Sequence, residues 1–164
     1  MKSKIVIIGM PGSGKTTIGK ILGKKLNLEF YDMDEYIQAT RSKTIMELFE
    51  NGEDYFRDIE TEACKELANK KNILISTGGG VVKRKENIDI LKDDSIIIFL
   101  DRPVEKILED VDVSKRPLLK GGKEKLLNLY KERYDLYKEA ADKIIVNDAT
   151  MYDVIEKFRE VITL

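Results

Sequence analysis

Gly9-Met-Pro-Gly-Ser-Gly-Lys15-Thr16 is the stretch of sequence that decides the fold. It satisfies the pattern G-x-x-x-x-G-K-[ST] of a P-loop, whose glycines let backbone N–H groups approach phosphate oxygens. An apolar, strand-like run at residues 5–8 precedes it, and apolar residues with helical spacing follow at Ile18, Ile21, Leu22 and Leu26. The start of that helix adds its dipole to the anion site. This context favours phosphate binding over the alternative, a glycine-rich turn without a ligand.

Strand-like runs alternate with helical patterns along the chain. Strands are expected at residues 4–8, 29–32, 72–76, 95–100 and 143–146. Helices are expected at residues 15–26, 34–40, 45–51, 53–69, 85–91, 125–140 and 151–162, with another that begins near Pro103. Three of the strands are apolar throughout, which is typical of strands buried on both faces of a parallel sheet.

These patterns predict an α/β fold, a three-layer sandwich around a parallel five-stranded sheet. One domain is expected to span residues 1–164. Residues 112–123 contain Gly, Pro and several charges without a sustained period, so we expect a lid there. Ligands of such folds bind at the carboxyl ends of the strands, where this sequence carries glycines, aspartates and Arg102.

Composition limits the partners and the compartment. Lys and Arg number 29 against 30 Asp and Glu, a formal net charge of −1, so no overall field favours nucleic acid or an anionic membrane. The apolar run at residues 5–8 is too short for a secretory signal, and no stretch approaches the roughly 20 apolar residues of a membrane-spanning helix. The single cysteine, Cys64, is expected in the core and cannot form an internal disulfide. We therefore expect a cytoplasmic protein without nucleic-acid or membrane partners.

The sequence contains no histidine, which excludes an imidazole base, a Ser-His-Asp triad and a His-ligated zinc. A proton removed near neutral pH is therefore expected to go to a carboxylate. Asp32 and Asp34 lie at i, i+2 where a predicted strand ends, so both side chains can point toward the phosphates. One is suited to help hold Mg²⁺, and the other to orient an acceptor hydroxyl and take its proton. The alternative is a polar junction in which Asp34 caps the next helix.

Two further features lie on the acceptor side. Arg57 and Glu60 share one face of a predicted helix. An arginine held by a carboxylate is a preorganised fork for a substrate carboxylate, although the spacing alone favours an ordinary surface ion pair. Three consecutive glycines at positions 78, 79 and 80 follow a buried strand, and they favour backbone contacts with a ligand over a long flexible turn.

Six segments together resemble the shikimate kinase family. They are GMPGSGKTTIG, YDMDEYI, TIMELFENGEDYFRDIE, LISTGGGVV, KRPLL and RYDLYKEAADKII, in the order of that family over residues 4–147. The resemblance implies a fold related to the P-loop nucleoside-monophosphate kinases. It also implies a kinase that transfers the γ-phosphoryl group of ATP to the 3-hydroxyl of shikimate, on the route to chorismate and the aromatic amino acids. We expect a monomer.

The resemblance also implies roles for individual residues. The ATP phosphates are expected at Gly12, Ser13, Gly14, Lys15, Thr16 and Thr17, and Mg²⁺ at Thr16 and Asp32. Shikimate is expected to contact Asp34, Arg57, Gly78, Gly79, Gly80 and Arg133. Lys15, Asp34 and Arg116 are the expected catalytic residues, with Arg116 reaching the ATP phosphates from the lid. Residues 146–150, expected at the adenine, lack the proline and arginine that often follow in the family.

Three other functions are consistent with a P-loop. The nearest is another small-molecule kinase of the P-loop class, such as a gluconate kinase. An adenylate-type kinase needs more arginines for its phosphorylated acceptor than Arg57 and Arg133 supply. A nucleotide-dependent switch has no use for an acceptor site, and the N-K-x-D motif of GTPases does not occur.

Overall fold

The computed structural model describes residues 2–110 and 122–162. Within them, five parallel strands form one sheet in the order β2-β3-β1-β4-β5. The strands are β1 (Lys4–Ile8), β2 (Glu29–Asp32), β3 (Ile73–Ser76), β4 (Ser95–Asp101) and β5 (Lys143–Val146). The P-loop follows β1, the central strand, so it lies at the middle of the carboxyl edge of the sheet.

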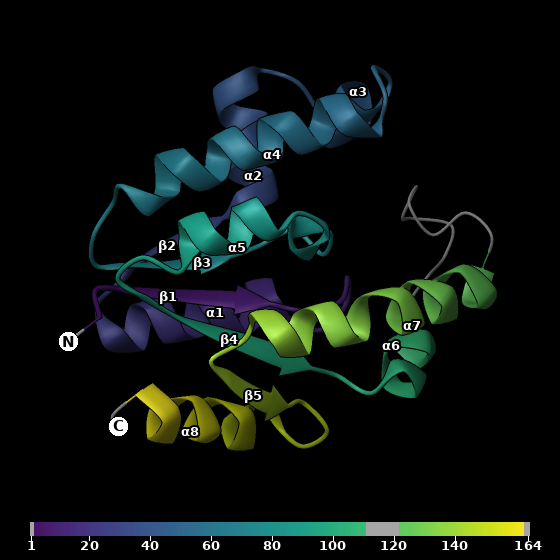
Figure 1. Cartoon of the computed structure of the whole chain (residues 1–164). Helices are drawn as coiled ribbons and strands as arrows, with labels where there is room; N and C mark the ends of the chain where they lie inside the picture. The colour runs from purple at the N-terminus through teal and green to yellow at the C-terminus, as the bar shows by residue number, and fades with distance from the viewer. Residues whose placement is uncertain (1, 111–121, 163–164) are drawn as a thin grey trace.

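Helices connect the strands on both faces (Figure 1). They are α1 (Lys15–Leu26), α2 (Met33–Arg41), α3 (Ile45–Phe49), α4 (Glu53–Ala68), α5 (Lys85–Leu91), α6 (Val104–Asp110), α7 (Gly122–Ala140) and α8 (Met151–Ile162), with a 3-10 turn η1 (Val81–Lys83) before α5. Short polar side chains start two of them: Asp32 caps α2 and Thr44 caps α3, each accepting a backbone N–H.

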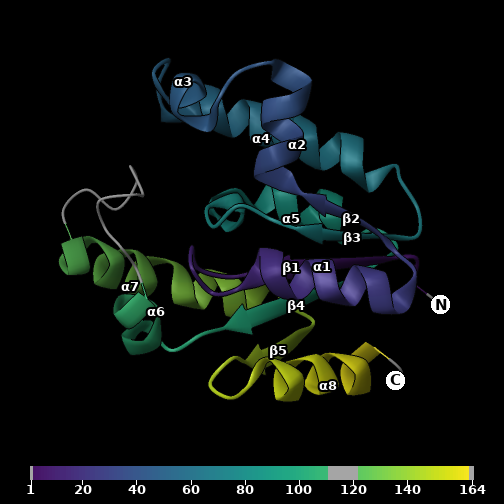
Figure 2. The same ribbon diagram turned by 180° about the vertical axis from the view of Figure 1, so that it is seen from behind.

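The alternation of side chains in β1 separates two cores. Ile5 and Ile7 pack with α1 and α8, whereas Val6 and Ile8 pack with α4, α5 and α7. Figures 1 and 2 show α1 on one side of the sheet and α5 and α7 on the other. β1 and β3 are buried along their whole length, as continuous apolar strands predict. The predicted three-layer α/β sandwich with a parallel five-stranded sheet is therefore confirmed.

The predicted element bounds need small corrections. α2 starts at Met33 rather than residue 34, and α3 ends at Phe49 rather than residue 51. α7 starts at Gly122, so residues 122 and 123 belong to this helix and not to a lid. The other predicted lid residues, 112–121, lie outside the described part of the chain, as does Arg116.

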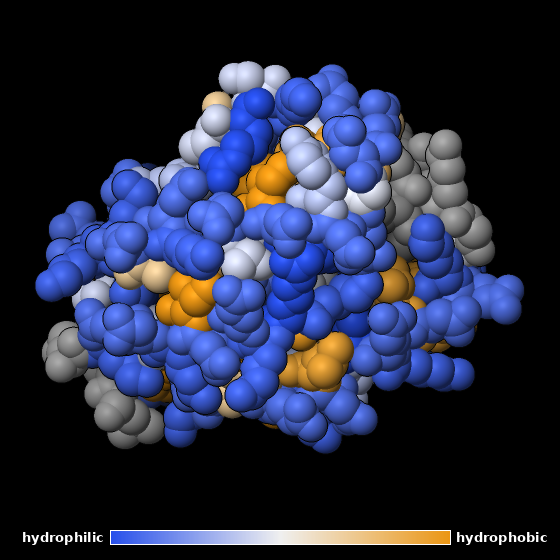
Figure 3. Space-filling view, turned by 45° about the horizontal axis from the view of Figure 1, so that its top comes forward, coloured by the Kyte–Doolittle hydropathy of each residue, from blue (hydrophilic) through white to orange (hydrophobic). Residues whose placement is uncertain are grey.

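The described surface is strongly polar. Figure 3 shows hydrophilic side chains over most of one face, with small, separate apolar patches, as a chain with 36% charged residues predicts. Among the described helices, none combines the length and the apolar character needed to cross a membrane. Cys64 is fully buried in the core on α4, as expected from its position on an apolar helix face.

Candidate active site

The P-loop turns sharply between β1 and α1. Gly14 has φ +97°, a left-handed conformation that side chains disfavour, and it places Lys15 at the start of α1. The Lys15 ammonium donates to the carbonyl oxygens of Gly9 and Met10, each at 2.8 Å. Lys15 is therefore buried against its own loop, where its charge is available to an anion seated on the backbone N–H groups.

Two side chains from neighbouring strand ends hold the P-loop from outside. Arg102, just after β4, donates from Nη1 to the carbonyl oxygen of Gly12 at 3.0 Å. Asn147, just after β5, donates from Nδ2 to the carbonyl oxygen of Ser13 at 2.9 Å. Both also line a cavity beside the loop, together with Gly14, Thr17, Ile18, Lys106, Ala149 and Met151. The segment expected at the adenine therefore borders the phosphate loop.

Thr16 forms an oxygen-rich cluster with the ends of two strands. Its hydroxyl donates to Asp32 Oδ2 at 2.6 Å and lies 3.5 Å from Ser76 Oγ. Mg²⁺ is usually bound by one or two carboxylates together with phosphates and waters, so these donors fit that ion. The described residues contain no cluster of three or more His, Cys, Asp or Glu suited to a metal, which is consistent with a site completed by phosphate oxygens.

Asp32 and Asp34 both lie near the phosphate loop, but not through strand alternation. β2 ends at Asp32, whose Oδ1 accepts the Glu35 N–H at 3.0 Å as the cap of α2. Asp34 lies in the first turn of that helix. Strand alternation therefore does not set the directions of the two side chains, and the alternative in which Asp34 caps the helix is wrong. The turn of the helix instead directs Asp34 into a second cavity.

Asp34 is electrostatically unusual. Its burial raises the pKa of the carboxyl group above the ordinary value of 3.8, and the nearby Asp32 charge raises this pKa further. Lys15 and Arg57 act in the opposite direction without cancelling the shift. A carboxylate with a raised pKa accepts a proton more readily than an exposed one.

Arg57 and Glu60 form a buried ion pair on α4. Arg57 Nη1 lies 2.9 Å from Glu60 Oε1, and the side chains are only 9% and 1% exposed. The surface ion pair that their spacing favoured is therefore wrong. Burial raises the pKa of Glu60, although Arg57 lowers it in part. The Arg57 guanidinium also lies over the rings of Phe49 and Phe56, 5.8 and 5.2 Å from their centroids, so it is fixed on several sides.

The three consecutive glycines allow this arrangement. A Cβ on Gly80 would lie 2.4 Å from both terminal nitrogens of Arg57, and a Cβ on Gly79 would lie 2.7 Å from Cδ of Pro11. Contacts this short are impossible, so only glycine lets the segment lie between the P-loop and Arg57. At Gly78 a Cβ would meet Asp34 and Glu60, each at 3.1 Å.

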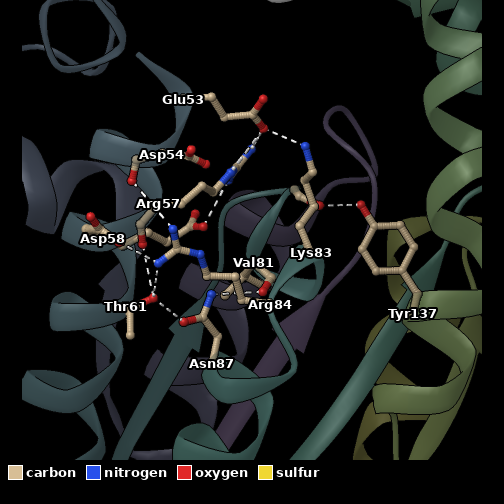
Figure 4. Close-up of polar contacts among 12 residues, drawn as sticks. Glu53, Asp54, Arg57, Asp58, Thr61, Val81, Lys83, Arg84, Asn87 and Tyr137 are labelled. Atoms are coloured by element: carbon tan, nitrogen blue, oxygen red, sulfur yellow. Dashed lines mark hydrogen bonds and ion pairs between the residues drawn. The ribbon is translucent and has the colours of Figure 1, made fainter. Parts of the chain in front are cut away.

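α7 supplies a second buried guanidinium group. Arg133 is 8% exposed, and its Nε has no hydrogen-bond partner among the described residues. One turn later, Tyr137 donates its hydroxyl to the Gly79 carbonyl oxygen at 2.5 Å, so it fixes the glycine segment against α7 (Figure 4). A buried donor without a partner is costly, and a ligand acceptor in the cavity would satisfy it.

These groups line one cavity. It measures about 230 Å³ and contains Asp34, Arg57, Glu60, Arg133 and the glycine segment, with Pro11 of the P-loop at its edge. This is smaller than the roughly 300–1,000 Å³ of pockets for drug-sized ligands, so it suits a small substrate. Two buried guanidinium groups suit an anion such as a carboxylate, and Asp34 places a carboxyl group with a raised pKa in the same cavity.

Known proteins with similar sequences and structures are shikimate kinases. The family model described as shikimate kinase matches residues 11–163. The chain is 60% identical over 162 residues to a shikimate kinase of Clostridium beijerinckii, covering 99% of this chain and 96% of that relative. The chain belongs to the shikimate kinase family. It is therefore an enzyme of the kinase class, as the sequence predicted.

Solved structures of shikimate kinases are similar over nearly the whole chain. The enzyme from Acinetobacter baumannii in complex with shikimate has a TM-score of 0.91 and 36% identity, with 98% of this chain and 93% of that chain covered. The enzyme from Aquifex aeolicus has a TM-score of 0.86 and 37% identity, with 98% and 96% covered. The P-loop nucleoside-monophosphate-kinase-like fold predicted for this shikimate kinase family member is thereby confirmed.

The described structure brings together the site residues expected of a shikimate kinase, except Arg116, which lies outside the described residues. Arg102, expected at a strand end near the ligand, contacts the P-loop. The structure also adds residues that the sequence reasoning missed: Glu53, Ser76, Lys83 and Tyr137. Two of these had a sequence signal. Glu53 lies four residues before Arg57, and Tyr137 lies four residues after Arg133, so each shares a helix face with an expected site residue. Ser76 and Lys83 had none beyond their places at or near strand ends.

Proposed function

We propose that this shikimate kinase family member transfers the γ-phosphoryl group of ATP to the 3-hydroxyl of shikimate, a step toward chorismate and the aromatic amino acids. The observation that carries the proposal is the cavity in which buried Arg57 and Arg133 accompany Asp34 beside the P-loop. Arg133, whose buried Nε has no hydrogen-bond partner among the described residues, and Arg57 together favour an anionic ligand. A carboxylate base next to a phosphate site favours a hydroxyl acceptor. Shikimate carries both groups.

The acceptor side divides into binding and proton transfer. Arg57 and Arg133 bind the substrate carboxylate through charge-assisted hydrogen bonds. Glu60, three residues later on α4, holds Arg57 in position, with 2.9 Å between Arg57 Nη1 and Glu60 Oε1. Asp34 orients the acceptor hydroxyl and accepts its proton as the new O–P bond forms, for which a raised pKa is favourable.

The phosphate side provides electrostatic stabilisation. Backbone N–H groups of residues 12–17 and the ammonium of Lys15 face the phosphates and stabilise charge on the transferring group. Thr16 and Asp32, joined at 2.6 Å, would hold Mg²⁺. When bound, this ion neutralises charge between the phosphates. Arg102 and Asn147 keep the loop in shape through the carbonyl oxygens of Gly12 and Ser13.

The remaining expectations complete the proposal. The enzyme works as a cytoplasmic, single-domain monomer without nucleic-acid or membrane partners. Arg116, within the expected lid, reaches the phosphates during the reaction and excludes water together with its neighbours.

A coupled assay of ATP consumption with shikimate, gluconate and AMP in parallel tests the proposed function. We expect turnover with shikimate only, and mass spectrometry should find the product heavier by one phosphoryl group. Turnover of gluconate or AMP without turnover of shikimate would contradict the assignment. Omission of Mg²⁺ should abolish the activity and its re-addition should restore it.

A further inference from the structure

Glu53 places a negative charge at the edge of the site for the substrate carboxylate. It is the first residue of α4, and its Oε1 lies 3.4 Å from both Nε and Nη2 of Arg57. Its side chain is 50% exposed and lines the same cavity as Arg57 and Arg133. Figure 4 shows Glu53 with dashed contacts to both Arg57 and Lys83.

This position creates a conflict with ligand binding. The Nε–Nη2 edge of a guanidinium is the fork that binds a carboxylate with two parallel hydrogen bonds. Glu53 faces that edge at distances longer than the usual 2.7–3.2 Å of a good hydrogen bond. A substrate carboxylate at the same edge would meet the Glu53 charge nearby, and like charges at an interface oppose binding.

Lys83 forms an ion pair with Glu53 and offsets this charge. Its Nζ lies 2.5 Å from Glu53 Oε1, closer than either Arg57 nitrogen. Lys83 ends η1, directly after the glycine segment, and its backbone N–H donates to the Gly80 carbonyl oxygen at 3.1 Å. Its hydrogen bond to Glu53 is the main reason that the pKa of this carboxyl group is lowered, so Glu53 is ionised at neutral pH.

We propose that Lys83 is a positioning residue for substrate binding: it holds Glu53 by the shorter of its contacts and offsets its charge, so that Glu53 can release the Nε–Nη2 edge of Arg57 to the substrate carboxylate. Of the two contacts of Glu53, the longer one to Arg57 is given up when the substrate binds, and the shorter one to Lys83 remains. The pair thus favours acidic ligands that can displace Glu53 from Arg57. This inference rests on the proposed function of Arg57 as the carboxylate-binding arginine.

The test is the substitution Lys83→Met, which keeps the length of the side chain and removes its charge. The Michaelis constant for shikimate should rise on the order of tenfold because the Glu53 charge is no longer offset. The kcat and the Michaelis constant for ATP should stay within about twofold of wild type, because Lys83 does not line the phosphate loop. Lys85→Met is the matched control: its side chain is 90% exposed, outside the cavity, and it should leave all three constants unchanged.

The double variant Glu53→Gln/Lys83→Met decides between indirect and direct action. If Lys83 acts through Glu53, removing the carboxylate charge as well should return the Michaelis constant for shikimate to within about twofold of wild type. Glu53→Gln alone should not raise it. An equally high value in the double and the Lys83→Met variants would overturn the proposal, because Lys83 would then contact the substrate itself. An unchanged value in Lys83→Met would overturn it as well.

The same experiment separates this inference from the proposed function. A wild-type enzyme without activity on shikimate would refute the proposed function. Suppose instead that the wild-type enzyme is active and that Lys83→Met and Glu53→Gln/Lys83→Met have the same Michaelis constant for shikimate. That result would refute only the role of the pair. Thermal unfolding of each variant completes the comparison, because loss of a merely structural tie would lower the melting temperature without rescue of the Michaelis constant by Glu53→Gln.

Discussion

The phosphate loop is made by consecutive residues, whereas the acceptor cavity takes its side chains from α2, α3, α4, η1 and α7 and part of its backbone from Gly78–Gly80. On the phosphate side the ligand groups are backbone N–H groups and Lys15, and the loop carbonyls are already bonded to Lys15, Arg102 and Asn147. On the acceptor side the ligand groups are side chains, fixed by packing between segments far apart in the sequence.

Substitutions are therefore expected to have different effects on the two sides of the site. Gly9 approaches the Leu100 backbone so closely that a Cβ would lie 2.6 Å from its carbonyl oxygen, and neither strand can move without disturbing the sheet. Gly80 approaches the far end of the Arg57 side chain instead. An added methyl group should therefore disturb the fold more at Gly9 than at Gly80, where it should affect mainly substrate recognition.

The largest effect is expected for Lys15→Met. Removing one preorganised charge from the transferring group should lower kcat by about 1,000-fold. The affinity for shikimate, measured by calorimetry without nucleotide, should change little, because Lys15 contacts the P-loop carbonyls and not the arginines of the cavity. Lys20→Met, on the exposed face of the same helix, is the control. Equal loss of shikimate affinity and kcat would contradict the division into two sides.

Arg57→Ala should damage the acceptor side and also the fold. The Michaelis constant for shikimate should rise roughly 100–1,000-fold, with ATP binding nearly intact. Leaving Glu60 buried without its partner should also cost about 3–5 kcal/mol in the free energy of unfolding, measured with urea. The exposed pair of Lys65 and Glu62 provides the control, since Lys65→Ala should leave the unfolding midpoint unchanged.

The double variant Arg57→Ala/Glu60→Gln distinguishes these two effects. A neutral amide in place of Glu60 should recover most of the lost stability, while the Michaelis constant for shikimate stays high. Recovery of substrate affinity in this variant would show that Arg57 only compensates Glu60 and does not bind the carboxylate.

The same difference explains what the sequence could predict. The P-loop, the buried strands and most element bounds depend on local patterns of glycines and apolar residues, and these predictions are confirmed. The burial of Arg57 depends on Gly80, Glu60 and two phenylalanine rings that meet only in the folded chain. The spacing of residues on one helix could not reveal these surroundings of Arg57, so it favoured a surface ion pair. The resemblance to a family, and not the pattern, pointed to Arg57 and Arg133.

Asp34 and Lys83 illustrate the limits further. The strand-alternation rule failed at Asp34 because β2 ends one residue before α2 begins, with Asp32 as the cap. Lys83 follows the glycines in a 3-10 turn, and its contact with Glu53 joins positions 30 residues apart. No charge pattern or helical spacing in the sequence predicts a contact between two positions so far apart.

Gly80→Ala provides a more moderate test of the acceptor side. The added methyl group would have to displace the Arg57 guanidinium, because it would lie 2.4 Å from its terminal nitrogens. Misplacing a binding group by about 1 Å should raise the Michaelis constant for shikimate roughly 10–100-fold. Stability should fall less than in Gly9→Ala, in which the added methyl group meets backbone. A thermal melt of both variants measures this, and equal destabilisation would break the comparison between the two sides.

The smallest effect is expected in the pH dependence of kcat. The pKa of Asp34 is raised above 3.8. As the pH falls, its carboxylate is therefore protonated earlier than an ordinary aspartate, and the protonated form cannot accept a proton from the substrate. The rate should therefore decrease on the acid side, by up to tenfold per pH unit below this raised pKa. Glu60 also has a raised pKa, mainly because it is buried, and the nearby Asp34 charge adds to this shift. In Glu60→Gln the acid limb should persist, moved to lower pH because one neighbouring carboxylate charge is gone. Its disappearance would assign the limb to Glu60 and leave Asp34 without the role of base.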